Sequence, residues 1–338
     1  MPVVSVLMPA FNAAATCDAA LDSVAGQTLG DFEVVAVDDG STDATPAILA
    51  ARGRADRRVR VLRTEHAGLV AALNHGLQHC RGEFVARMDA DDRCRPRRLE
   101  LQVAAMRSRP DLSVVSCLVE GFPAENVGEG LRVYLAWQNA LLEPDDIARE
   151  IFVESPIVHP SAMMRRAELL ALGGYRERGW PEDYDLWLRY HAAGRRFAKV
   201  PVSLFCWREH GARATRTDRR YAVENFLRAK VHYLIAGPLA DRQDVVVWGA
   251  GRTGRRLAKL LERGGRQPCL FVDIAPRRIG GRLRRRPVIG PEELTAAWRA
   301  LARPVLLVAV ASRGARPLIR AQLAAAGLHE GDHFFCVA

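Results

Sequence analysis

Residues 83–92 read EFVARMDADD, in which an apolar segment runs directly into three carboxylates. Alternate side chains of a strand point to the same side, so Asp89 and Asp91 are expected to converge at the end of a strand. Paired carboxylates beside open space suit a hard divalent cation such as Mg²⁺ or Mn²⁺, with other coordination positions left to water and phosphate oxygens. Taken alone, an Asp-x-Asp pair more often marks a solvated acidic turn, so the interpretation depends on the rest of the chain.

The bulk composition is that of an ordinary globular protein, with 49% hydrophobic and 26% charged residues among 338. This length is sufficient for two domains with their own cores. No apolar run approaches the roughly 18–20 residues that span a bilayer. Residues 1–4 lead straight into an expected strand without a signal segment, so we expect a cytoplasmic protein, with at most peripheral contact at the inner face of the membrane. Seven scattered cysteines, without a Cys-x-x-Cys pair, indicate neither a zinc site nor a disulfide framework.

Positive charge is concentrated in the C-terminal third. Residues 241–338 hold 18 basic and 8 acidic side chains and so account for the whole net charge of +10. No aromatic residues interleave with the basic run from Arg277 to Arg286, and no DNA- or RNA-binding motif is present, so we expect no nucleic-acid partner. A solvated basic face is the simplest interpretation, and attraction to anionic lipid or phosphorylated ligands is the other.

The first part of the chain alternates strands with helices. The apolar pattern predicts strands over residues 3–8, 32–37, 59–63 and 83–88, and helices over residues 14–26, 41–52 and 69–79. This order is typical of a doubly wound α/β sheet, in which ligands bind at the carboxyl ends of the strands. Three polar motifs fall at such ends, at residues 9–12, 38–39 and 89–92.

Eight short motifs, in order, make the N-terminal 210 residues resemble the inverting family 2 glycosyltransferases, which have the GT-A fold for nucleotide-diphospho-sugars. The matching segments are residues 3–12, 37–43, 68–74, 81–83, 88–92, 157–161, 182–187 and 207–210. The resemblance implies an α/β chain whose residues 1–238 form a GT-A catalytic domain.

The resemblance also implies a donor-nucleotide site. Pro9 and Phe11 would pack on the base, although the family commonly has Tyr where this chain has Phe11. Asp39 would accept a hydrogen bond from a uracil-type imide, because an ionised carboxylate is an acceptor only. A helix cap is the alternative role for Asp39, although Ser41 or Asp43 could serve there.

By the same resemblance, Asp89 and Asp91 would hold the metal ion that bridges the donor diphosphate, with Asp89 also contacting the nucleotide and Asp92 close by. His210 matches a late position that contacts the metal or the diphosphate, and a neutral imidazole can ligate Mn²⁺. A purely structural role for His210 is the alternative.

Inverting transfer requires a base that deprotonates the acceptor hydroxyl as it attacks the anomeric carbon. Asp183 matches the family's base, and Glu182 and Asp185 are its competitors. The alternative to a catalytic role is that these residues only form an exposed acidic helix start, which the helix dipole favours. Trp180 is a candidate for stacking on an acceptor sugar.

Residues 239–338 form a second expected domain. Gly249, Gly251 and Gly254 follow an apolar segment and open an expected helix, and Asp273 ends the next strand, which is the context of a dinucleotide-type phosphate loop. The segment resembles the small Rossmann-like modules found beside sugar-modifying enzymes. It would bind a nucleotide, dinucleotide or nucleotide-sugar, with a purely structural fold as the alternative.

These observations predict a metal-dependent inverting glycosyltransferase that moves a sugar from a nucleotide-sugar, with a UDP-sugar as the expected donor, to a hydroxyl of a glycan, a lipid-linked oligosaccharide or a metabolite. A non-catalytic nucleotide-sugar sensor is one alternative. A nucleotidyltransferase is another, disfavoured because residues 9–12 lack a glycine-rich loop with a phosphate-gripping Arg or Lys.

Overall fold

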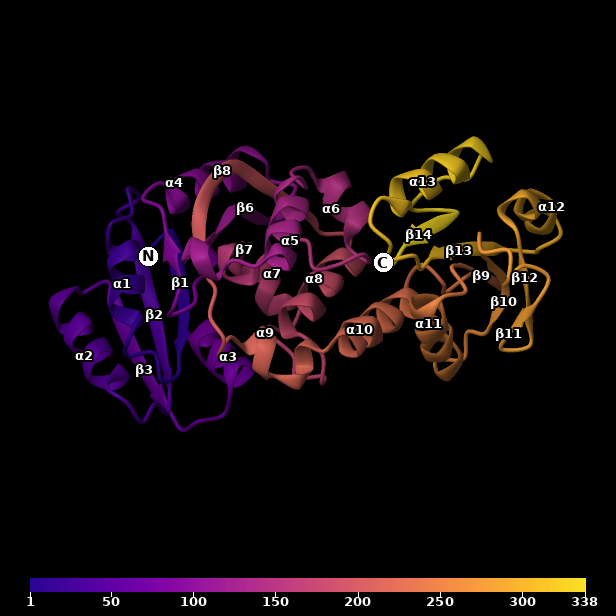
Figure 1. The fold of residues 1–338 in the computed structure, drawn as a ribbon. Helices are drawn as coiled ribbons and strands as arrows, with labels where there is room; N and C mark the ends of the chain where they lie inside the picture. Colours follow the sequence, from indigo (N-terminus) through magenta and orange to yellow (C-terminus); the bar gives the residue numbers. More distant parts are fainter. The chain divides into compact units, whose positions relative to one another are not determined.

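A computed structural model describes residues 1–338, apart from the side chain of Ala214, and divides the chain into two compact units (Figure 1). The first unit contains Met1–Ala148 and Pro156–Arg219, and the second contains Arg149–Ser155 and Arg220–Ala338. The division therefore falls before α10 (Val223–Ala236), whereas the sequence predicted it at residues 238–239. The reason is that α10 packs against α11 (Arg252–Arg263) of the second unit.

The first unit is built on an eight-stranded sheet with strand order β3-β2-β1-β4-β7-β6-β8-β5. The four neighbouring strands β3, β2, β1 and β4 run parallel, and β7 runs antiparallel to both β4 and β6. The strands are β1 (Val4–Ala10), β2 (Phe32–Asp39), β3 (Val59–Thr64), β4 (Phe84–Arg87), β5 (Arg93–Cys94), β6 (Leu112–Phe122), β7 (Met163–Arg165) and β8 (Arg196–Arg208). The four strands predicted for the first 90 residues are confirmed to within a few residues.

Helices cover both faces of the parallel part of this sheet. Alternate side chains of β1 divide between two layers: Val6 and Met8 join the core that contains α1 and α4, and Leu7 faces Gly76 of α3. Burial on both faces explains the nearly continuous apolar sequence of these strands. The helices of this part of the chain are α1 (Cys17–Ala25), α2 (Thr45–Ala55), α3 (Leu69–His79), α4 (Arg98–Ser108), α5 (Glu129–Asn139), α6 (Pro144–Glu150), α7 (Arg166–Ala171), α8 (Glu182–Ala192) and α9 (Ala214–Thr217).

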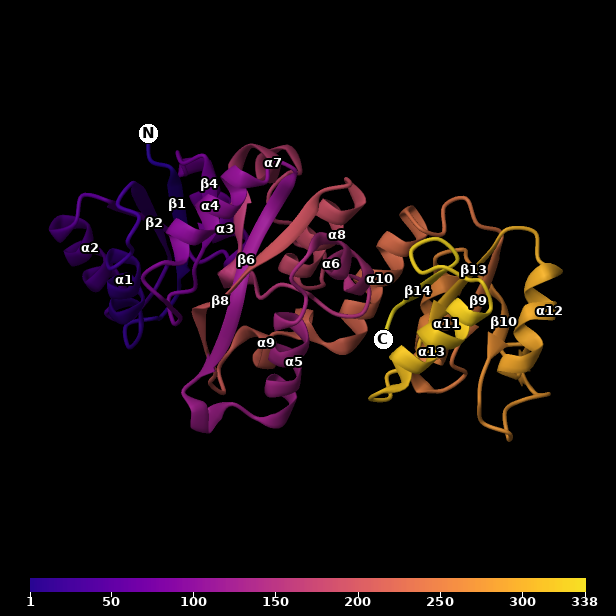
Figure 2. The same cartoon turned by 90° about the horizontal axis from the view of Figure 1, so that it is seen from above.

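The second unit has a six-stranded sheet with order β11-β12-β10-β9-β13-β14. Figure 2 labels four of these strands, β10, β9, β13 and β14. All pairs are parallel except the hairpin of β11 with β12. When the five parallel strands are numbered by their order in the chain, they lie side by side as 3-2-1-4-5, the order of a doubly wound fold. The elements are β9 (Asp244–Trp248), β10 (Pro268–Val272), β11 (Arg282–Leu283), β12 (Arg286–Ile289), α12 (Leu294–Arg299), β13 (Pro304–Val308), α13 (Ala315–Ala325) and β14 (Phe334–Cys336).

The segment 149–155 belongs to the second unit through buried polar contacts. Glu150 forms ion pairs with Arg316 at 2.7 Å and Arg320 at 2.6 Å, and its side chain is only 5% exposed. Lys230 of α10 is buried and donates a hydrogen bond to the carbonyl oxygen of Val153 at 2.6 Å. Buried charges need such partners, so these contacts fix the segment in place. Among the described helices, none combines the length and apolar character required to cross a bilayer.

Candidate active site

Three carboxylates gather in the turn after β4. Single oxygens of Asp89, Asp91 and Asp92 all lie within 4.8 Å of one another. Asp92 is buried, and its Oδ1 accepts a hydrogen bond from the backbone N–H of Arg208 at 2.7 Å. Its Oδ2 is also buried but has no hydrogen-bond partner among the described residues. A buried carboxylate oxygen without a donor is unfavourable, and a bound cation would satisfy it.

The electrostatics of this turn also favour a cation. Burial, and then the charge of Asp89, raises the pKa of Asp91, and His210 opposes the shift. Burial raises the pKa of Asp92 well above its ordinary value, with further contributions from Asp89 and Asp91. Carboxylates this close to one another resist joint ionisation unless a positive charge lies between them. The all-oxygen donor set therefore fits the Mg²⁺ or Mn²⁺ that the sequence predicted.

His210 lies beside the same turn, in the segment after β8. Its Nε2 is 2.9 Å from Oδ2 of Asp91, and the preceding Arg208 donates from Nε to the carbonyl oxygen of Asp91 at 2.6 Å. The structure thus brings together Asp89, Asp91 and His210, the three residues predicted as metal ligands. A contact between His210 and the metal ion stays a prediction, because the contact with Asp91 could equally serve to position that carboxylate.

Asp39, at the end of β2, is tied to the loop before α3. Its Oδ1 accepts the backbone N–H of Ala67 and its Oδ2 that of Gly68, both at 2.9 Å. Nδ1 of His66 is also 2.9 Å from Oδ2. Asp43 instead serves the start of α2, accepting the N–H of Thr45 at 2.9 Å. Sequence reasoning missed this role of Asp39 in ordering the loop; its predicted hydrogen bond to a base would use the remaining lone pairs.

The ring of Phe11 stacks on His66, with centroids 4.0 Å apart and planes inclined by 21°. Phe11 still exposes 45% of its surface, which is unusual for a large apolar side chain at a strand end. The adjacent Asn12 joins two loops, because its N–H donates to Oγ of Ser41 and its Oδ1 accepts the N–H of Thr42, both at 2.9 Å. An apolar ring therefore stays exposed at the carboxyl edge of the sheet, and its packing on a nucleotide base stays a prediction.

The three acidic candidates at the start of α8 differ in exposure. Glu182 and Asp185 are buried, whereas Asp183 is partly exposed. Asp185 accepts from Nε1 of Trp180 at 2.9 Å and from Nε of Arg189 at 2.8 Å, so it holds structure. Trp180 is only 8% exposed, which leaves little of its ring for the predicted stacking on a sugar.

A buried polar group connects the acidic turn with the start of α8. Arg87 donates to Oδ1 of Asp89 at 2.6 Å. Burial works to lower the pKa of Arg87, but Asp89, Tyr175 and Glu182 together raise it. His159 lies 3.1 Å from the hydroxyl of Tyr175 and 3.8 Å from Glu182; burial and then Arg87 lower its pKa well below the usual range, so the imidazole is neutral. Sequence reasoning missed Arg87, whose signal is a basic residue inside an apolar strand.

The glycine-rich loop of the second unit has the predicted strand–turn–helix context. Gly249 and Gly251 lie between β9 and α11, and Gly254 lies in the first turn of α11. Asp273 follows β10, and its Oδ2 accepts the N–H of Ala250 at 2.7 Å. The structure therefore brings the four predicted residues of this unit together.

Comparison with known proteins identifies the first unit. The model of the family described as Glycosyl transferase family 2 matches residues 5–173, which is half of the chain. The chain belongs to this family. Putative glycosyltransferase EpsE of Bacillus subtilis (strain 168) is 32% identical over 229 residues, covering 66% of this chain and 79% of EpsE. The Escherichia coli UDP-Gal:alpha-D-GlcNAc-diphosphoundecaprenol beta-1,3-galactosyltransferase is 27% identical over 230 residues, covering 68% of this chain and 81% of that enzyme.

Solved structures confirm the GT-A fold of this family 2 glycosyltransferase. Residues 1–349 of S. aureus TarS, in complex with UDP-GlcNAc, superpose with a TM-score of 0.58 at 21% identity, covering 78% of this chain and 72% of that one. The Pyrobaculum calidifontis mannosyltransferase PcManGT, with GDP-Man and Mn2+, gives a TM-score of 0.50 at 24% identity. The match covers 72% of this chain and 65% of PcManGT. The predicted enzyme class is therefore confirmed, and the sensor and nucleotidyltransferase alternatives are disfavoured.

Proposed function

We propose that this glycosyltransferase is metal-dependent and inverting, and transfers a sugar from a UDP-sugar to an acceptor hydroxyl. The observation that carries the proposal is the acidic turn after β4, in which three carboxylates converge and a buried oxygen of Asp92 has no described partner. This turn lies at the same sheet edge as Phe11 and Asp39, because β1, β2 and β4 are parallel neighbours.

The donor nucleotide would lie against the ends of β1 and β2. Pro9 and Phe11 offer apolar surface to the base, and Asp39 offers an anionic acceptor to an imide N–H, which uracil has. The TarS structure contains UDP-GlcNAc, and the E. coli relative is named for UDP-Gal, which supports a UDP-linked donor. PcManGT was solved with GDP-Man, so GDP-sugars belong among the donors to be tested.

Asp89 and Asp91 would hold the divalent cation, with Asp92 and His210 beside them. When bound, the metal ion neutralises charge on the diphosphate and so makes the nucleotide a better leaving group. Arg87 holds Asp89 in place by its hydrogen bond, and Arg208 holds the backbone of Asp91. The Mn2+ in PcManGT supports this role for the turn.

Asp183 would act as the general base. The acceptor oxygen attacks the anomeric carbon from the face opposite the diphosphate, the bond from that carbon to the phosphate oxygen breaks, and Asp183 takes the hydroxyl proton. The nucleoside diphosphate leaves with the bonding electrons, and the configuration inverts. The partial exposure of Asp183, beside the buried Glu182 and Asp185, supports the choice of this carboxylate.

The acceptor would be a sugar hydroxyl of a glycan or of a lipid-linked oligosaccharide. The E. coli relative is named for a diphosphoundecaprenol-linked acceptor, and the Erwinia amylovora relative AmsE for amylovoran biosynthesis.

For the second unit we propose nucleotide or nucleotide-sugar binding at Gly249, Gly251, Gly254 and Asp273. A location in the cytoplasm, at most peripheral to the membrane, accompanies this proposal.

Nucleotide release from a panel of UDP-, GDP- and dTDP-sugars tests the proposal directly. Wild-type protein is compared with Asp91→Asn and Asp183→Asn, each with Mn²⁺, Mg²⁺ or EDTA. We expect slow hydrolysis of one donor, lost with EDTA and in both variants. Asp31→Asn is the matched control, because Asp31 is exposed before β2 and should leave release unchanged.

Binding of UDP separates the two roles if hydrolysis needs an acceptor. We expect metal-dependent UDP binding that survives in Asp183→Asn and fails in Asp91→Asn. Equal binding by wild type and Asp91→Asn would remove the metal assignment. Full turnover by Asp183→Asn, with an acceptor supplied, would remove the base assignment.

A further inference from the structure

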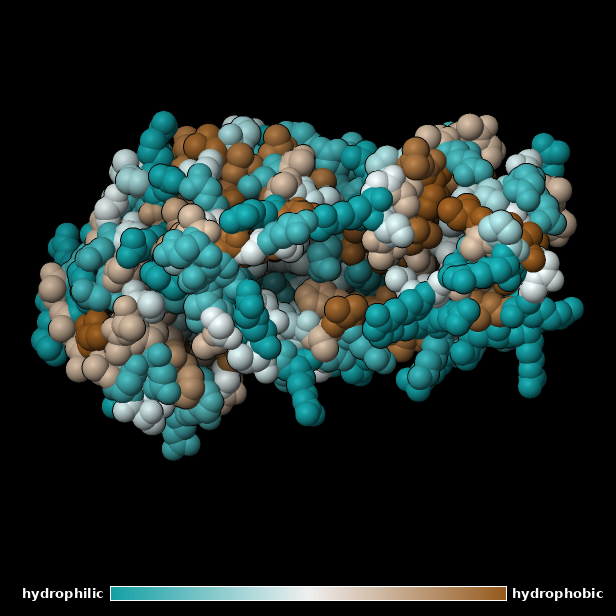
Figure 3. Space-filling model, in the orientation of Figure 1, coloured by the Kyte–Doolittle hydropathy of each residue, from teal (hydrophilic) through white to brown (hydrophobic). Residues whose placement is uncertain are grey.

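The second unit has a cavity at the carboxyl ends of β9 and β10, about 600 Å³ in volume. It is lined by one glycine and five arginines: Gly251, Arg252, Arg255, Arg256, Arg277 and Arg278. Figure 3 shows hydrophilic side chains projecting from this unit over α11 and β11. The cavity lies where doubly wound sheets bind their ligands.

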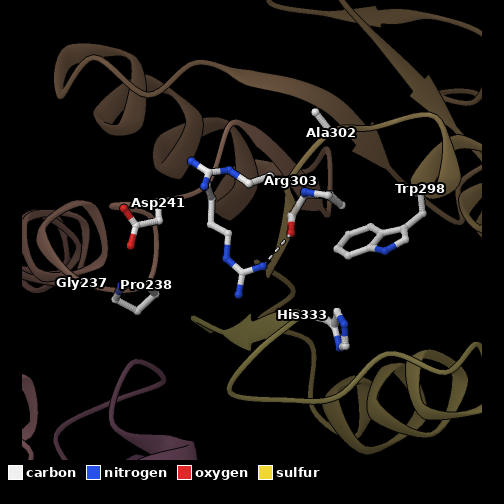
Figure 4. Close-up of a pocket in the computed structure, with 9 residues that line it drawn as sticks. Gly237, Pro238, Asp241, Trp298, Ala302, Arg303 and His333 are labelled. Atoms are coloured by element: carbon white, nitrogen blue, oxygen red, sulfur yellow. Dashed lines mark hydrogen bonds between the residues drawn. The ribbon is translucent and has the colours of Figure 1, made fainter.

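A second cavity, of about 630 Å³, lies at the opposite ends of the strands and differs in character (Figure 4). Its lining combines the acidic Asp241 with Arg303, Trp298 and His333. The residues just before β9 and β13 form it, so it faces away from the glycine-rich loop. Because its lining carries charges of both signs, this cavity indicates no ligand class. The arginine-lined cavity carries positive charge only.

The three glycines of the loop have different reasons for lacking a side chain. A Cβ at Gly254 would lie 1.7 Å from the carbonyl oxygen of Gly249, so packing within the loop requires Gly254. Gly249 has a φ of 114°, and its Cβ would lie 2.9 Å from the carbonyl oxygen of Ala309. Gly251 has no such requirement: its φ is −79°, and its Cβ would meet only the guanidinium of Arg278 at 3.6 Å. The open space at Gly251 lies inside the cavity.

Both carboxylate oxygens of Asp273 accept hydrogen bonds, from the glycine-rich loop, from the cavity lining and from the segment after β10. Its Oδ2 accepts from the N–H of Ala250 at 2.7 Å and from Arg278 at 2.9 Å, and its Oδ1 accepts from the N–H of Ala275 at 2.9 Å. In dinucleotide sites, the acidic residue at this strand end binds the ribose hydroxyls. Here both carboxylate oxygens already accept hydrogen bonds and the charge is paired with Arg278, so this site is better arranged for the phosphate groups of a nucleotide than for its ribose.

The remaining arginines present unpaired positive charge. Arg252, Arg256 and Arg277 are exposed and make no ion pair with another described side chain. Other arginines of this unit do pair, such as Arg284 with Glu262 and Arg316 with Glu150. Several guanidinium groups beside a helix N-terminus repel one another until an anion lies among them.

We propose that this cavity binds the diphosphate group of a soluble ligand, through Arg252, Arg256, Arg277 and Arg278, with the backbone at Gly251 in close approach. Guanidinium groups match phosphate oxygens in pairs, and the helix start of α11 adds unsatisfied N–H groups. Free pyrophosphate and a nucleoside diphosphate share this chemistry. The inference rests on the ligand binding proposed above for the second unit, and it is independent of the transfer reaction because every residue in it belongs to that unit.

Calorimetry with the full chain carrying Asp91→Asn, in EDTA, isolates this site from the metal-dependent donor site. The probes are inorganic pyrophosphate, UDP and NADH, each at low and moderate salt. The test variants are Arg252→Glu with Arg256→Glu, and separately Gly251→Ala, whose Cβ the fold accommodates. The control is Lys259→Glu with Arg263→Glu, which makes the same charge change farther along α11.

We expect one pyrophosphate site per chain, weakened about tenfold or more in both test variants and unchanged in the control. UDP binding that is tighter than pyrophosphate binding would identify a nucleotide as the ligand, and equal binding would identify the diphosphate alone. Absence of pyrophosphate binding, or an equal loss in the control, would overturn the proposal. NADH binding that survives Gly251→Ala would overturn it as well.

Discussion

The guanidinium of Arg87 is buried and donates a hydrogen bond of 2.6 Å to Oδ1 of Asp89, in the middle of the acidic turn. The charge of Glu182, at the start of α8, also acts on this guanidinium. A single buried cation therefore contacts the proposed metal-binding turn and interacts electrostatically with the helix that carries the proposed base. These two motifs lie almost 100 residues apart in the sequence.

Replacing Arg87 tests this relationship. In Arg87→Met, Asp89 loses the donor that fixes its carboxylate, so we expect the Mn²⁺ requirement to rise and kcat/KM for the donor to fall about 10- to 100-fold. Nucleotide release as a function of Mn²⁺ concentration measures both quantities. Arg87→Lys, which keeps the charge, should recover part of the loss.

Arg107→Met is the matched control, because Arg107 forms an exposed ion pair with Glu83 at 3.6 Å. It should leave release unchanged. A lower melting temperature of Arg87→Met with an unaltered Mn²⁺ dependence would show that Arg87 serves the fold and does not position Asp89.

The two aspartates of α8 should separate stability from catalysis. Asp185 is buried and accepts from Trp180 and Arg189, so Asp185→Ala leaves a buried guanidinium unpaired and should lower the free energy of unfolding by about 3–5 kcal/mol. Asp183→Asn, at a partly exposed position, should leave that free energy within about 0.5 kcal/mol and abolish turnover. Urea denaturation and nucleotide release measure the two effects. Equal destabilisation by both substitutions would contradict the division of roles.

Gly40 fixes the loop that carries His66. Its φ is 71°, and a Cβ there would lie 2.6 Å from the backbone nitrogen of His66. Gly40→Ala should therefore destabilise the protein by about 1–3 kcal/mol and weaken UDP binding, because His66 would shift from Phe11 and Asp39. Gly194→Ala is the control for backbone strain alone, since Gly194 lies outside the proposed donor site and has a φ of 68° but nothing within 4 Å of a Cβ. UDP binding weakened equally by both would mean that His66 is not involved.

Local sequence signals were sufficient for the parallel strands, because β1, β2 and β4 are apolar runs that end in polar motifs. They were not sufficient where a role depends on distant partners. Asp39 meets Ala67 and Gly68 only once β2 and β3 are paired, so its loop contacts could not be foreseen. The same holds for α8, where burial, and not residue type, distinguishes Asp183 from Glu182 and Asp185.

The division of the chain shows this limit most clearly. A glycine–proline pair at 237–238 suggested a boundary, but α10 packs on α11 and so belongs with the second unit. Segment 149–155 has no local signal at all, since its place depends on Glu150 meeting Arg316 and Arg320 far along the chain. Long-range ion pairs of this kind leave no periodic pattern in a single sequence.

Lys199 should make stability depend on pH. Its ammonium group is buried and donates to Oε1 of Gln138 at 2.7 Å, and burial lowers its pKa from 10.5 to about 7. Above that pH the folded protein holds a neutral amine, while the unfolded chain stays protonated up to its ordinary pKa. Unfolding then takes up a proton, so the free energy of unfolding rises with pH across this window, by at most about 1.4 kcal/mol per pH unit.

Lys199→Met removes this titration. Urea denaturation at two pH values within the window should show a rise in the free energy of unfolding that is about 1–2 kcal/mol larger for the wild type than for Lys199→Met. The comparison uses the change with pH, because the loss of the bond to Gln138 shifts the variant's stability equally at both values. Lys259→Met, at an exposed lysine, should retain the full wild-type rise. Parallel profiles for the wild type and Lys199→Met would show that Lys199 stays protonated in the folded protein, with Gln138 and solvent stabilising its charge.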